Sequence, residues 1–348
     1  MNDYTLFDVT IIGGGPAGLY SAFYSGLRGM KTKIIEFQSE LGGKLRVYPE
    51  KMIWDVGGMT PMPCAQLTKQ IIQQGLTFNP EVVLDEKIIS ITKSTDGYFT
   101  LQSANGNEHY SKAVIVAIGG GILKPQKLEI EGAERFEVTN LNYTIKSLQR
   151  FKDKIVLISG GGNSAIDWAN ELEPIAKKVY LTYRKTHLNA HEAQISQLIK
   201  SSAQCYLSTN ITKLIANDEN QIESVELMHT ETDEKTTVAV DEVIINHGYE
   251  RESELLTKSN LDIELVDDFY IAGTPNSQTS LPGLFAAGDI VAYNGKVHLI
   301  AGAFQDAVNA VNKAKQYIEP DAHESGMVSS HNDVFKERNR ELIAQMLS

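Results

Sequence analysis

The sequence feature that most constrains the fold is a glycine-rich turn between an apolar segment and a helix-like segment near the start of the chain. Residues 9–12 are apolar and rich in β-branched side chains, as expected of a buried strand. Gly13, Gly15 and Gly18 follow with the spacing G-x-G-x-x-G. In a βαβ motif the first glycine permits a tight turn, the second lets a pyrophosphate approach the backbone, and the third lets helix and strand pack closely. The pattern predicts a dinucleotide-binding motif.

The residues around this turn extend the prediction. Pro16 and Ala17 open the helix, whose first N–H groups would face the phosphates. A second apolar strand, residues 33–35, ends in Glu36, whose carboxylate can accept hydrogen bonds from an adenosine ribose. Glycine-rich turns also serve structural purposes, but strand, helix and acid in this order favour a nucleotide site.

A second βαβ motif begins near residue 154. The predicted strand 155–158 runs into a turn, and a helix is expected over 166–173. The turn residues expected to contact a nucleotide are Gly160, Gly162, Asn163 and Ser164.

The two motifs differ in charge at the end of their second strands. The second motif has Arg184 and Lys185 where the first has Glu36. An acid suits a free ribose hydroxyl, whereas a cation can neutralise a ribose 2′-phosphate. The first motif is therefore interpreted as the FAD site and the second as the NADPH site; the alternative for the two cations is an ordinary solvated strand end.

Composition excludes several classes of function. At 348 residues, two domains are expected. No stretch has the roughly 18 to 20 apolar residues of a membrane span, and the first residues lack the features of a secretory signal, so a cytoplasmic location is expected. A formal net charge of -12 argues against nucleic-acid binding. It would also repel an acidic redox protein unless Lys and Arg gather in a local patch.

The two cysteines, Cys64 and Cys205, lie far apart in sequence and form no C-x-x-C. Local spacing therefore provides neither a redox dithiol nor a cysteine-based metal site. No metal site is predicted.

Other segments complete the expected organisation. A strong strand, residues 113–118, runs into three glycines, and strand 242–246 leads to His247 and Gly248; both ends are plausible hinges between domains. Residues 82–101 and 211–227 have β character. Helices are expected over 65–75, 190–201, 300–317 and 333–347.

Together, the two glycine-rich turns, the VIVAIGGG strand (114–121) and the AAGD motif (286–289) resemble the thioredoxin-reductase-like flavoproteins. The resemblance implies an α/β fold with two Rossmann-like, three-layer ββα domains, the NADPH domain being inserted into a discontinuous FAD domain. The implied FAD domain comprises 1–120 and 248–348, with the tail 319–348 covering the flavin, and the NADPH domain comprises 121–247.

The chain departs from the thioredoxin reductases themselves, because residues 136–150 contain no C-x-x-C. Electrons would leave from the flavin rather than through a dithiol. The segments LGGKL (41–45), YPEK (48–51) and WDVGG (54–58) resemble the ferredoxin–NADP reductases of the thioredoxin-reductase-like type. The long tail, with Ser329-Ser330-His331 and Val334-Phe335-Lys336-Glu337, resembles the iron-acquisition subgroup of these reductases in Gram-positive bacteria, whose members reduce ferric siderophores or serve haem-degrading enzymes.

The resemblance also implies residue roles. Asp289 would hydrogen-bond the ribityl and pyrophosphate side of the flavin. Tyr48 would stack on one flavin face and His331 would cover the other; the alternatives are a tyrosine packed in its loop and a solvated histidine. Lys44 would lie beside the flavin, or else in solvent. Backbone contacts to adenine and flavin are implied for Ile88 and Leu123.

The expected function is an FAD-dependent oxidoreductase that passes hydride from NADPH to FAD and single electrons to an iron acceptor. The acceptor would be ferredoxin or flavodoxin, and the protein a homodimer by resemblance. The alternatives are a ferric-siderophore reductase, which the negative net charge slightly favours, and an electron donor to a haem-degrading enzyme. A non-catalytic flavin redox sensor is less favoured, and a disulfide reductase would require Cys64 or Cys205 near the flavin.

Overall fold

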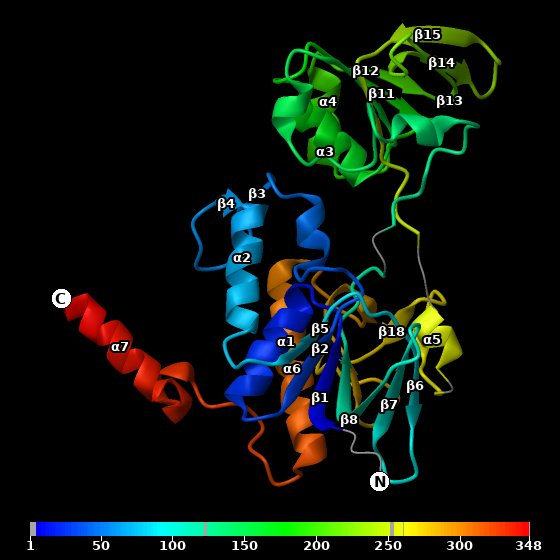
Figure 1. The fold of residues 1–348 in the computed structure, drawn as a ribbon. Coiled ribbons are helices and arrows are strands. Elements are labelled where there is room, and N and C mark those ends of the chain that lie inside the picture. The colour runs from blue at the N-terminus through cyan, green and yellow to red at the C-terminus, as the bar shows by residue number, and fades with distance from the viewer. Residues whose placement is uncertain (1–4, 122–123, 251–253, 260, 348) are drawn as a thin grey trace. The chain divides into compact units, whose positions relative to one another are not determined.

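The computed structural model describes residues 5–121, 124–250, 254–259 and 261–347 (Figure 1). These residues form two compact units. The first unit comprises Met1–Arg46, Lys51–Ile122 and Arg251–Ser348, and the second unit comprises Val47–Glu50 and Leu123–Glu250. The sequence predicted that the chain passes from one domain to the other at 120/121 and at 247/248, and the structure has these boundaries at 122/123 and 250/251. The sequence did not predict that Val47–Glu50 belongs to the second unit.

The first unit contains a seven-stranded sheet built around β1 (Leu6–Ile12), which pairs in parallel with β2 (Thr32–Ile35) and β8 (Glu108–Val116). The strand order is β5-β2-β1-β8-β7-β6, and β19 (Leu284–Ala286) also pairs with β8. The remaining strands are β5 (Glu81–Val83), β6 (Ile88–Lys93) and β7 (Phe99–Ser103).

Three helices cover one face of this sheet: α1 (Pro16–Leu27), α2 (Cys64–Gly75) and α6 (Ile300–Ile318) (Figure 1). Their packing follows from small side chains, because α6 buries a row of alanines, including Ala303, Ala307 and Ala310. A Cβ at Gly75 would lie 2.8 Å from the Leu19 side chain, so α2 approaches α1 closely.

Alternating residues of the central strands separate two cores. Val9 and Ile11 join the helical side, whereas Ile12 and Val114 pack with Phe99 of the β6–β7 hairpin on the other side. The central strands are therefore buried on both faces, as parallel strands usually are.

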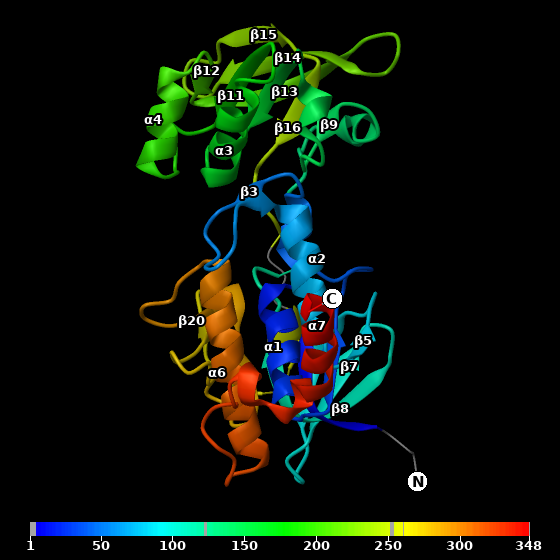
Figure 2. The same ribbon diagram turned by 90° about the vertical axis from the view of Figure 1, so that its left-hand side faces the viewer.

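The second unit repeats this plan with a five-stranded parallel sheet. The strand order is β12-β11-β10-β16-β9, with β9 (Leu141–Asn142), β10 (Ile155–Ser159), β11 (Lys178–Tyr183), β12 (Gln204–Leu207) and β16 (Glu242–Ile245). Figures 1 and 2 show α3 (Asn163–Leu172) and α4 (Glu192–Lys200) on one side of the sheet. The antiparallel strands β13 (Thr209–Ala216), β14 (Ile222–His229) and β15 (Lys235–Ala239) lie on the other. The predicted α/β fold with Rossmann-like parallel sheets is confirmed.

The remaining strands and α-helices of the described residues are as follows. They are β3 (Met52–Ile53), β4 (Met62–Pro63), α5 (Glu254–Lys258), β17 (Leu265–Val266), β18 (Tyr270–Ala272), β20 (Val291–Ala292) and α7 (Lys336–Leu347). The tail helix expected over 333–347 begins at Lys336, because a 3-10 turn precedes it and the Asn332 side chain accepts a hydrogen bond from the N–H of Val334. No helix in the described ranges is both long and apolar enough to cross a lipid bilayer.

Candidate nucleotide-binding sites

The three glycines of the first turn occupy different surroundings. Gly13 has φ +107°, and a Cβ there would lie 2.4 Å from the carbonyl oxygen of Ala117. A Cβ at Gly18 would lie 1.9 Å from the carbonyl oxygen of Gly13. A Cβ at Gly15 would meet only Gly43, at 3.8 Å. The first and third glycines are thus required by packing, whereas the second leaves space above the turn, as a bound pyrophosphate requires.

The start of α1 adds to this cradle. Pro16 is the first residue of the helix, Ala17 follows it, and no side chain of the described residues caps the helix start. No acidic residue lies in the first turn. The N–H groups at this end and the positive end of the helix dipole are therefore available to an anion.

Glu36 is anchored to the same turn. It directly follows β2, is only 7% exposed, and its Oε2 accepts a hydrogen bond from the N–H of Gly14 at 2.5 Å. Its Oε1 accepts another from the N–H of Gln38 at 2.8 Å. Each carboxylate oxygen carries two lone pairs, so the group can still accept hydrogen bonds from a ribose.

The AAGD motif meets the start of α1. Gly288 has φ +80°, and a Cβ there would lie 2.9 Å from the Cβ of Ala17. The next residue, Asp289, has a side chain 44% exposed, with its Oδ1 3.8 Å from Nδ1 of His298. The structure therefore brings Asp289 to the glycine turn that the sequence assigned to the same cofactor.

A buried network supports the AAGD motif and was not predicted. The carboxylate of Asp306, in α6, is fully buried and accepts hydrogen bonds from the N–H of Gly288 at 3.0 Å and from the hydroxyl of Tyr293 at 2.7 Å. It also forms an ion pair with the buried ammonium of Lys296. Burial and the nearby carboxylate raise the pKa of Tyr293 to about 12. The signal available in the sequence was an aspartate on the alanine-rich face of α6, at helical spacing from Ala303 and Ala310.

The second turn has a similar construction. Gly160 has φ +151°, and a Cβ there would lie 2.5 Å from the carbonyl oxygen of Asn246. At Gly161 a Cβ would lie 2.2 Å from the ring of Tyr183, whereas at Gly162 only a carbonyl oxygen 4.0 Å away would be met. The second turn is thus closed on one side and open above its third glycine.

The polar residues that follow this turn are placed as follows. Asn163 begins α3, and its side-chain oxygen accepts a hydrogen bond from the N–H of His191 at 3.1 Å, while Ser164 is exposed. Arg184 and Lys185 directly follow β11, and both are exposed. Among the residues that the structure describes, neither of these two side chains forms an ion pair. Their charges are available to a phosphate.

The residues assigned to the flavin by resemblance are divided between the two units. Tyr48 lies in the second unit, where its ring centroid is 6.0 Å from that of Trp168 and its hydroxyl interacts with Tyr249. Burial, and then the contact with Tyr48, raise the pKa of Tyr249. Stacking of Tyr48 on a flavin stays a prediction.

The other residues assigned to the flavin lie in the first unit, except for one that falls outside the described residues. Lys44 is exposed in the 3-10 turn Gly43–Val47, Ile88 is buried at the start of β6, and His331 is exposed in the 3-10 turn Ser329–His331. Leu123 lies outside the described residues. The roles of these residues also stay predictions.

Neither cysteine has the surroundings of a reactive thiol. Cys64 is buried and its thiol donates a hydrogen bond to the carbonyl oxygen of Leu45, and burial raises its pKa. Burial also raises the pKa of the half-buried Cys205, in the second unit. Both thiols are therefore held in the protonated form, which is the less nucleophilic one. No group of three or more potential metal ligands occurs in the described part of the chain.

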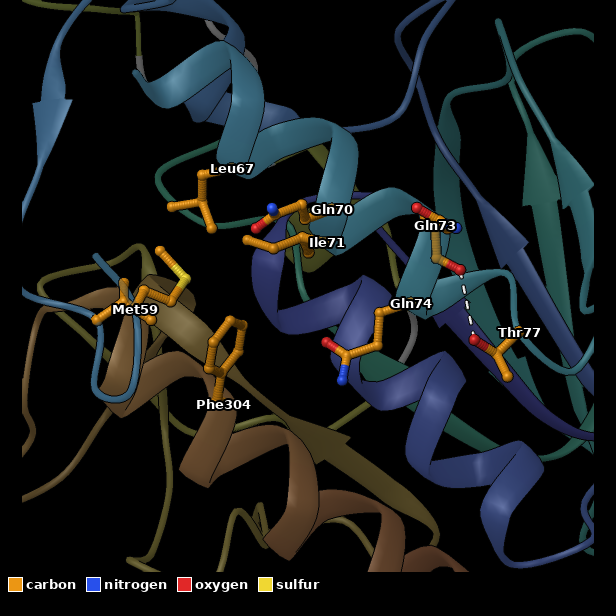
Figure 3. A pocket seen from close by; sticks show the side chains of 9 residues that line it. Met59, Leu67, Gln70, Ile71, Gln73, Gln74, Thr77 and Phe304 are labelled. Carbon is orange, nitrogen blue, oxygen red and sulfur yellow. Dashed lines mark hydrogen bonds between the residues drawn. The ribbon is translucent and has the colours of Figure 1, made fainter. Parts of the chain in front are cut away.

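A groove of about 410 Å³ lies elsewhere in the first unit, between α2 and α6 (Figure 3). Met59, Ile71 and Phe304 face this space, and glutamines of α2 line it. It has no charged side chain in its lining and includes none of the residues predicted to bind a nucleotide.

Comparison with known proteins agrees with this geometry. The chain matches the family described as pyridine nucleotide-disulphide oxidoreductase over residues 7–314. It is 69% identical over all 348 residues to ferredoxin–NADP reductase 1 of Bacillus mycoides, and covers 100% of that protein. It is 67% identical to ferredoxin–NADP reductase 2 of Exiguobacterium sibiricum, with 100% of this chain and 99% of that protein covered.

Solved structures show the same fold at low identity. Thioredoxin reductase of Lactococcus lactis matches with a TM-score of 0.74 and 24% identity, covering 90% of this chain and 99% of that one. Thioredoxin reductase of T. acidophilum matches with a TM-score of 0.75 and 23% identity, covering 91% and 99%. The structure has two glycine turns on Rossmann-like sheets, the family match covers residues 7–314, and the full-length identities are 67% to 69%. The chain therefore belongs to the pyridine nucleotide-disulphide oxidoreductases and, within them, to the ferredoxin–NADP reductases with a thioredoxin-reductase-like fold.

Proposed function

We propose that the protein is an FAD-dependent NADPH oxidoreductase that delivers single electrons to an iron acceptor, with ferredoxin or flavodoxin as the first candidates. FAD and NADPH are the cofactors that its family membership implies. The observation that carries the proposal is the contrast between an acid, Glu36, at the first nucleotide turn and two cations, Arg184 and Lys185, at the second.

The residues of the first unit fit FAD. Gly13, Pro16, Ala17 and Gly18 shape the turn and the helix start, and Gly15 leaves the space for a pyrophosphate. Glu36 would hold the adenosine ribose, and Asp289 would accept hydrogen bonds on the flavin side. When bound, the flavin supplies the hydride acceptor and the single-electron donor. We assign this first unit, Met1–Arg46, Lys51–Ile122 and Arg251–Ser348, as the FAD domain.

The second unit fits NADPH. The pyrophosphate would lie at the start of α3, beside Gly160, Gly162, Asn163 and Ser164. The 2′-phosphate would be neutralised by Arg184 and Lys185. We assign this second unit, Val47–Glu50 and Leu123–Glu250, as the NADPH domain.

Residues near the reacting atoms are proposed by resemblance. Tyr48 and His331 would cover opposite faces of the isoalloxazine ring, which would exclude water there. Lys44 would place a positive charge near the flavin, and Ile88 would contribute a backbone contact. Homodimer formation is a prediction of the same kind, and we also propose a cytoplasmic location.

The proposal has two versions, which differ in the electron acceptor. The curated relatives are named ferredoxin–NADP reductases, which supports ferredoxin. The net charge of -12 favours a small ferric chelate instead, because an acidic protein acceptor would be repelled. A ferric siderophore, or electron delivery to a haem-degrading enzyme, is therefore the second candidate.

One experiment tests the nucleotide assignment. Arg184→Gln should raise the KM for NADPH by about tenfold to a hundredfold and leave that for NADH nearly unchanged, since a charge-assisted hydrogen bond contributes about 1.5–3 kcal/mol. Lys178→Gln, at the start of the same strand, is the matched control. Equal losses with both nucleotides would contradict the assignment, and slow anaerobic flavin reduction in the wild type would favour a redox sensor.

A second experiment identifies the acceptor. Reduction of ferredoxin and of a ferric hydroxamate is measured side by side at low and high salt. A protein acceptor should show a steep salt dependence because its docking is electrostatic, whereas a small chelate should show a shallow one. An enzyme that reduces neither acceptor faster than it reduces oxygen would contradict the proposal of an iron acceptor.

A further inference from the structure

The two nucleotide turns are closed by the same backbone contact, and this makes their residues comparable one by one. Gly13 approaches the carbonyl oxygen of Ala117, and Gly160 approaches that of Asn246, with distances of 2.4 and 2.5 Å from the ideal Cβ. Ala117 follows β8 and Asn246 follows β16, each of which is the parallel neighbour of the strand that precedes the turn. Asn246 is thus the counterpart of Ala117, and His247 is the counterpart of Ile118.

The second unit therefore has polar residues where the first has apolar ones. Nε2 of His247 lies 2.8 Å from the hydroxyl oxygen of Ser159, the last residue of β10, which directly precedes Gly160. The N–H of Asn246 donates to the carbonyl oxygen of Ser159 at 2.7 Å. These two contacts hold the imidazole at the carboxyl end of β10, beside the glycine turn.

This position is where a dinucleotide crosses a doubly wound sheet. β10 lies between β11 and β16. In doubly wound sheets, ligands bind at the carboxyl ends of the strands, where the chain connections leave in opposite directions. Arg184 directly follows β11 on one side of β10, and His247 lies two residues after the end of β16 on the other side. A nucleotide whose 2′-phosphate binds Arg184 must pass its pyrophosphate over the turn between them.

Two charged groups and one neutral hydroxyl act on the His247 ring. The Arg184 guanidinium beyond β11 repels a proton on the ring, and Glu129 attracts one. Ser159 contributes a neutral hydroxyl. Burial, and then Arg184, lower the pKa of His247 from its ordinary value, which favours the neutral ring in the free protein.

We propose that His247 binds the pyrophosphate of NADPH in the second unit and takes up one proton from solvent as the nucleotide binds. The proposal rests on the proposed function, since it requires that unit to be the NADPH site. Two changes favour the proton: the 2′-phosphate offsets the charge of Arg184, and the pyrophosphate places negative charge beside the ring. The contribution of His247 to affinity is present at low pH and is lost as pH rises through the pKa of the complex.

Calorimetry with NADP⁺ tests the proposal on the oxidised, FAD-loaded protein. Binding is measured for the wild type and for His247→Gln at about pH 6 and about pH 8, in buffers of different ionisation enthalpy. The variant should bind about tenfold more weakly at the lower pH and less than about threefold more weakly at the higher pH. Proton uptake should occur in the wild type near neutral pH and be absent in the variant.

Comparing the affinity of the wild type with that of the variant at each pH cancels the effect of ligand titration. The 2′-phosphate of the ligand titrates near pH 6 itself, but it does so equally with both proteins. His229→Gln is the matched control, because His229 ends β14 and its ring accepts hydrogen bonds from the N–H groups of Glu231 and Thr232 in a hairpin. It should bind NADP⁺ like the wild type.

A measurement on the unaltered protein complements the variant. The proton resonances of the His247 ring, identified by their absence from the spectrum of His247→Gln, should titrate at higher pH when NADP⁺ is present. A wild type that does not bind NADP⁺ would overturn the proposed function itself. Suppose that the wild type binds NADP⁺ through Arg184, that the ratio of wild-type to His247→Gln affinity is the same at both pH values, and that the variant takes up as many protons as the wild type. Only this inference is then overturned.

Discussion

Gly15 and Gly18 belong to one sequence pattern, yet the structure gives them different physical roles. The added Cβ of Gly18→Ala would meet the carbonyl oxygen of Gly13 at 1.9 Å, which the backbone cannot relieve without shifting the turn. Gly15 has φ −79°, a conformation that alanine adopts, and its Cβ would meet nothing closer than 3.8 Å. The first substitution should therefore act on folding and the second on the ligand.

We predict that Gly15→Ala keeps the stability of the cofactor-free protein within about 1 kcal/mol but weakens FAD binding by tenfold or more, because the methyl group occupies the space of the pyrophosphate. Gly18→Ala should lower the free energy of unfolding by several times this amount. Thermal unfolding of the FAD-free proteins and fluorescence titration with FAD measure the two effects. Tight FAD binding by Gly15→Ala would contradict the cradle described for the first turn.

Glu86 provides a pH-dependent contribution to stability. Burial alone would raise the pKa of its carboxyl group, but hydrogen bonds from His109, Ser103 and Asn107 outweigh burial and lower it. Oε1 of Glu86 lies 2.8 Å from Nε2 of His109, whose Nδ1 lies 3.1 Å from the ammonium of the buried Lys33. Because the folded-state pKa is depressed, the stabilisation is fully present above the unfolded value and is lost as pH falls through the folded one.

Glu86→Gln should accordingly lower the free energy of unfolding at pH 7 by about 1–3 kcal/mol, since it removes a buried, hydrogen-bonded charge. The difference from the wild type should shrink as pH falls below about 4.5, the ordinary value for glutamate. Urea unfolding at a series of pH values measures it. Asp96→Asn, in the exposed turn between β6 and β7, is the control and should show little difference at any pH. A constant gap across the acid range would contradict this account.

At the scale of elements, α6 connects the AAGD motif to the core. The helix is almost uncharged on its buried face, where the carboxylate of Asp306 holds Gly288, Tyr293 and Lys296. A buried ion pair of this kind contributes little over an apolar pair, but removing one partner leaves an unpaired buried charge.

Asp306→Ala should therefore destabilise the protein by about 3–5 kcal/mol and weaken FAD retention. The double variant Asp306→Asn with Lys296→Met leaves no charge and should regain much of the stability. Glu319→Gln, which breaks the exposed pair with Lys315 at the end of the same helix, should cost less than about 1 kcal/mol. Thermal unfolding and the rate of FAD release measure these effects. A double variant no more stable than Asp306→Ala would show that charge is not the cause.

At the scale of the whole molecule, the two tryptophans report on different units. Trp168 is 3% exposed in the second unit, whereas Trp54 is 75% exposed in the first. Unfolding of the second unit should therefore produce most of the change in tryptophan fluorescence, and Trp54→Phe should remove only a solvent-exposed background.

In the Trp54→Phe variant, NADP⁺ at about a hundred times its Kd should stabilise the transition reported by Trp168 by about 2.7 kcal/mol. Added FAD should raise the temperature at which flavin is released more than it raises the temperature of the Trp168 transition, because the proposed FAD site lies in the first unit. Thermal scans with each ligand alone measure both effects. A Trp168 transition that responds to FAD but not to NADP⁺ would reverse the assignment of cofactors to units.

Much of the fold was predictable because its signals are local. The β-branched strand before Gly13, the glycine spacing and the acid at residue 36 all lie within one βαβ motif, and the same holds for the motif around Gly160. Local signals failed where structure depends on weak or distant pairing. β15 was not expected, because its exposed threonines acquire strand geometry only by pairing with β14.

The sequence by itself determined two glycine turns on parallel sheets and the opposite charges beside them, because backbone conformation and charge at these positions depend on nearest neighbours along the chain. Only the tertiary structure decided that Asp306 supports Gly288, that Tyr48 packs beside Trp168, and that His247 occupies the place of Ile118. Those relations join residues that are distant in sequence, and which of them meet is set by how sheets and helices pack rather than by any local spacing.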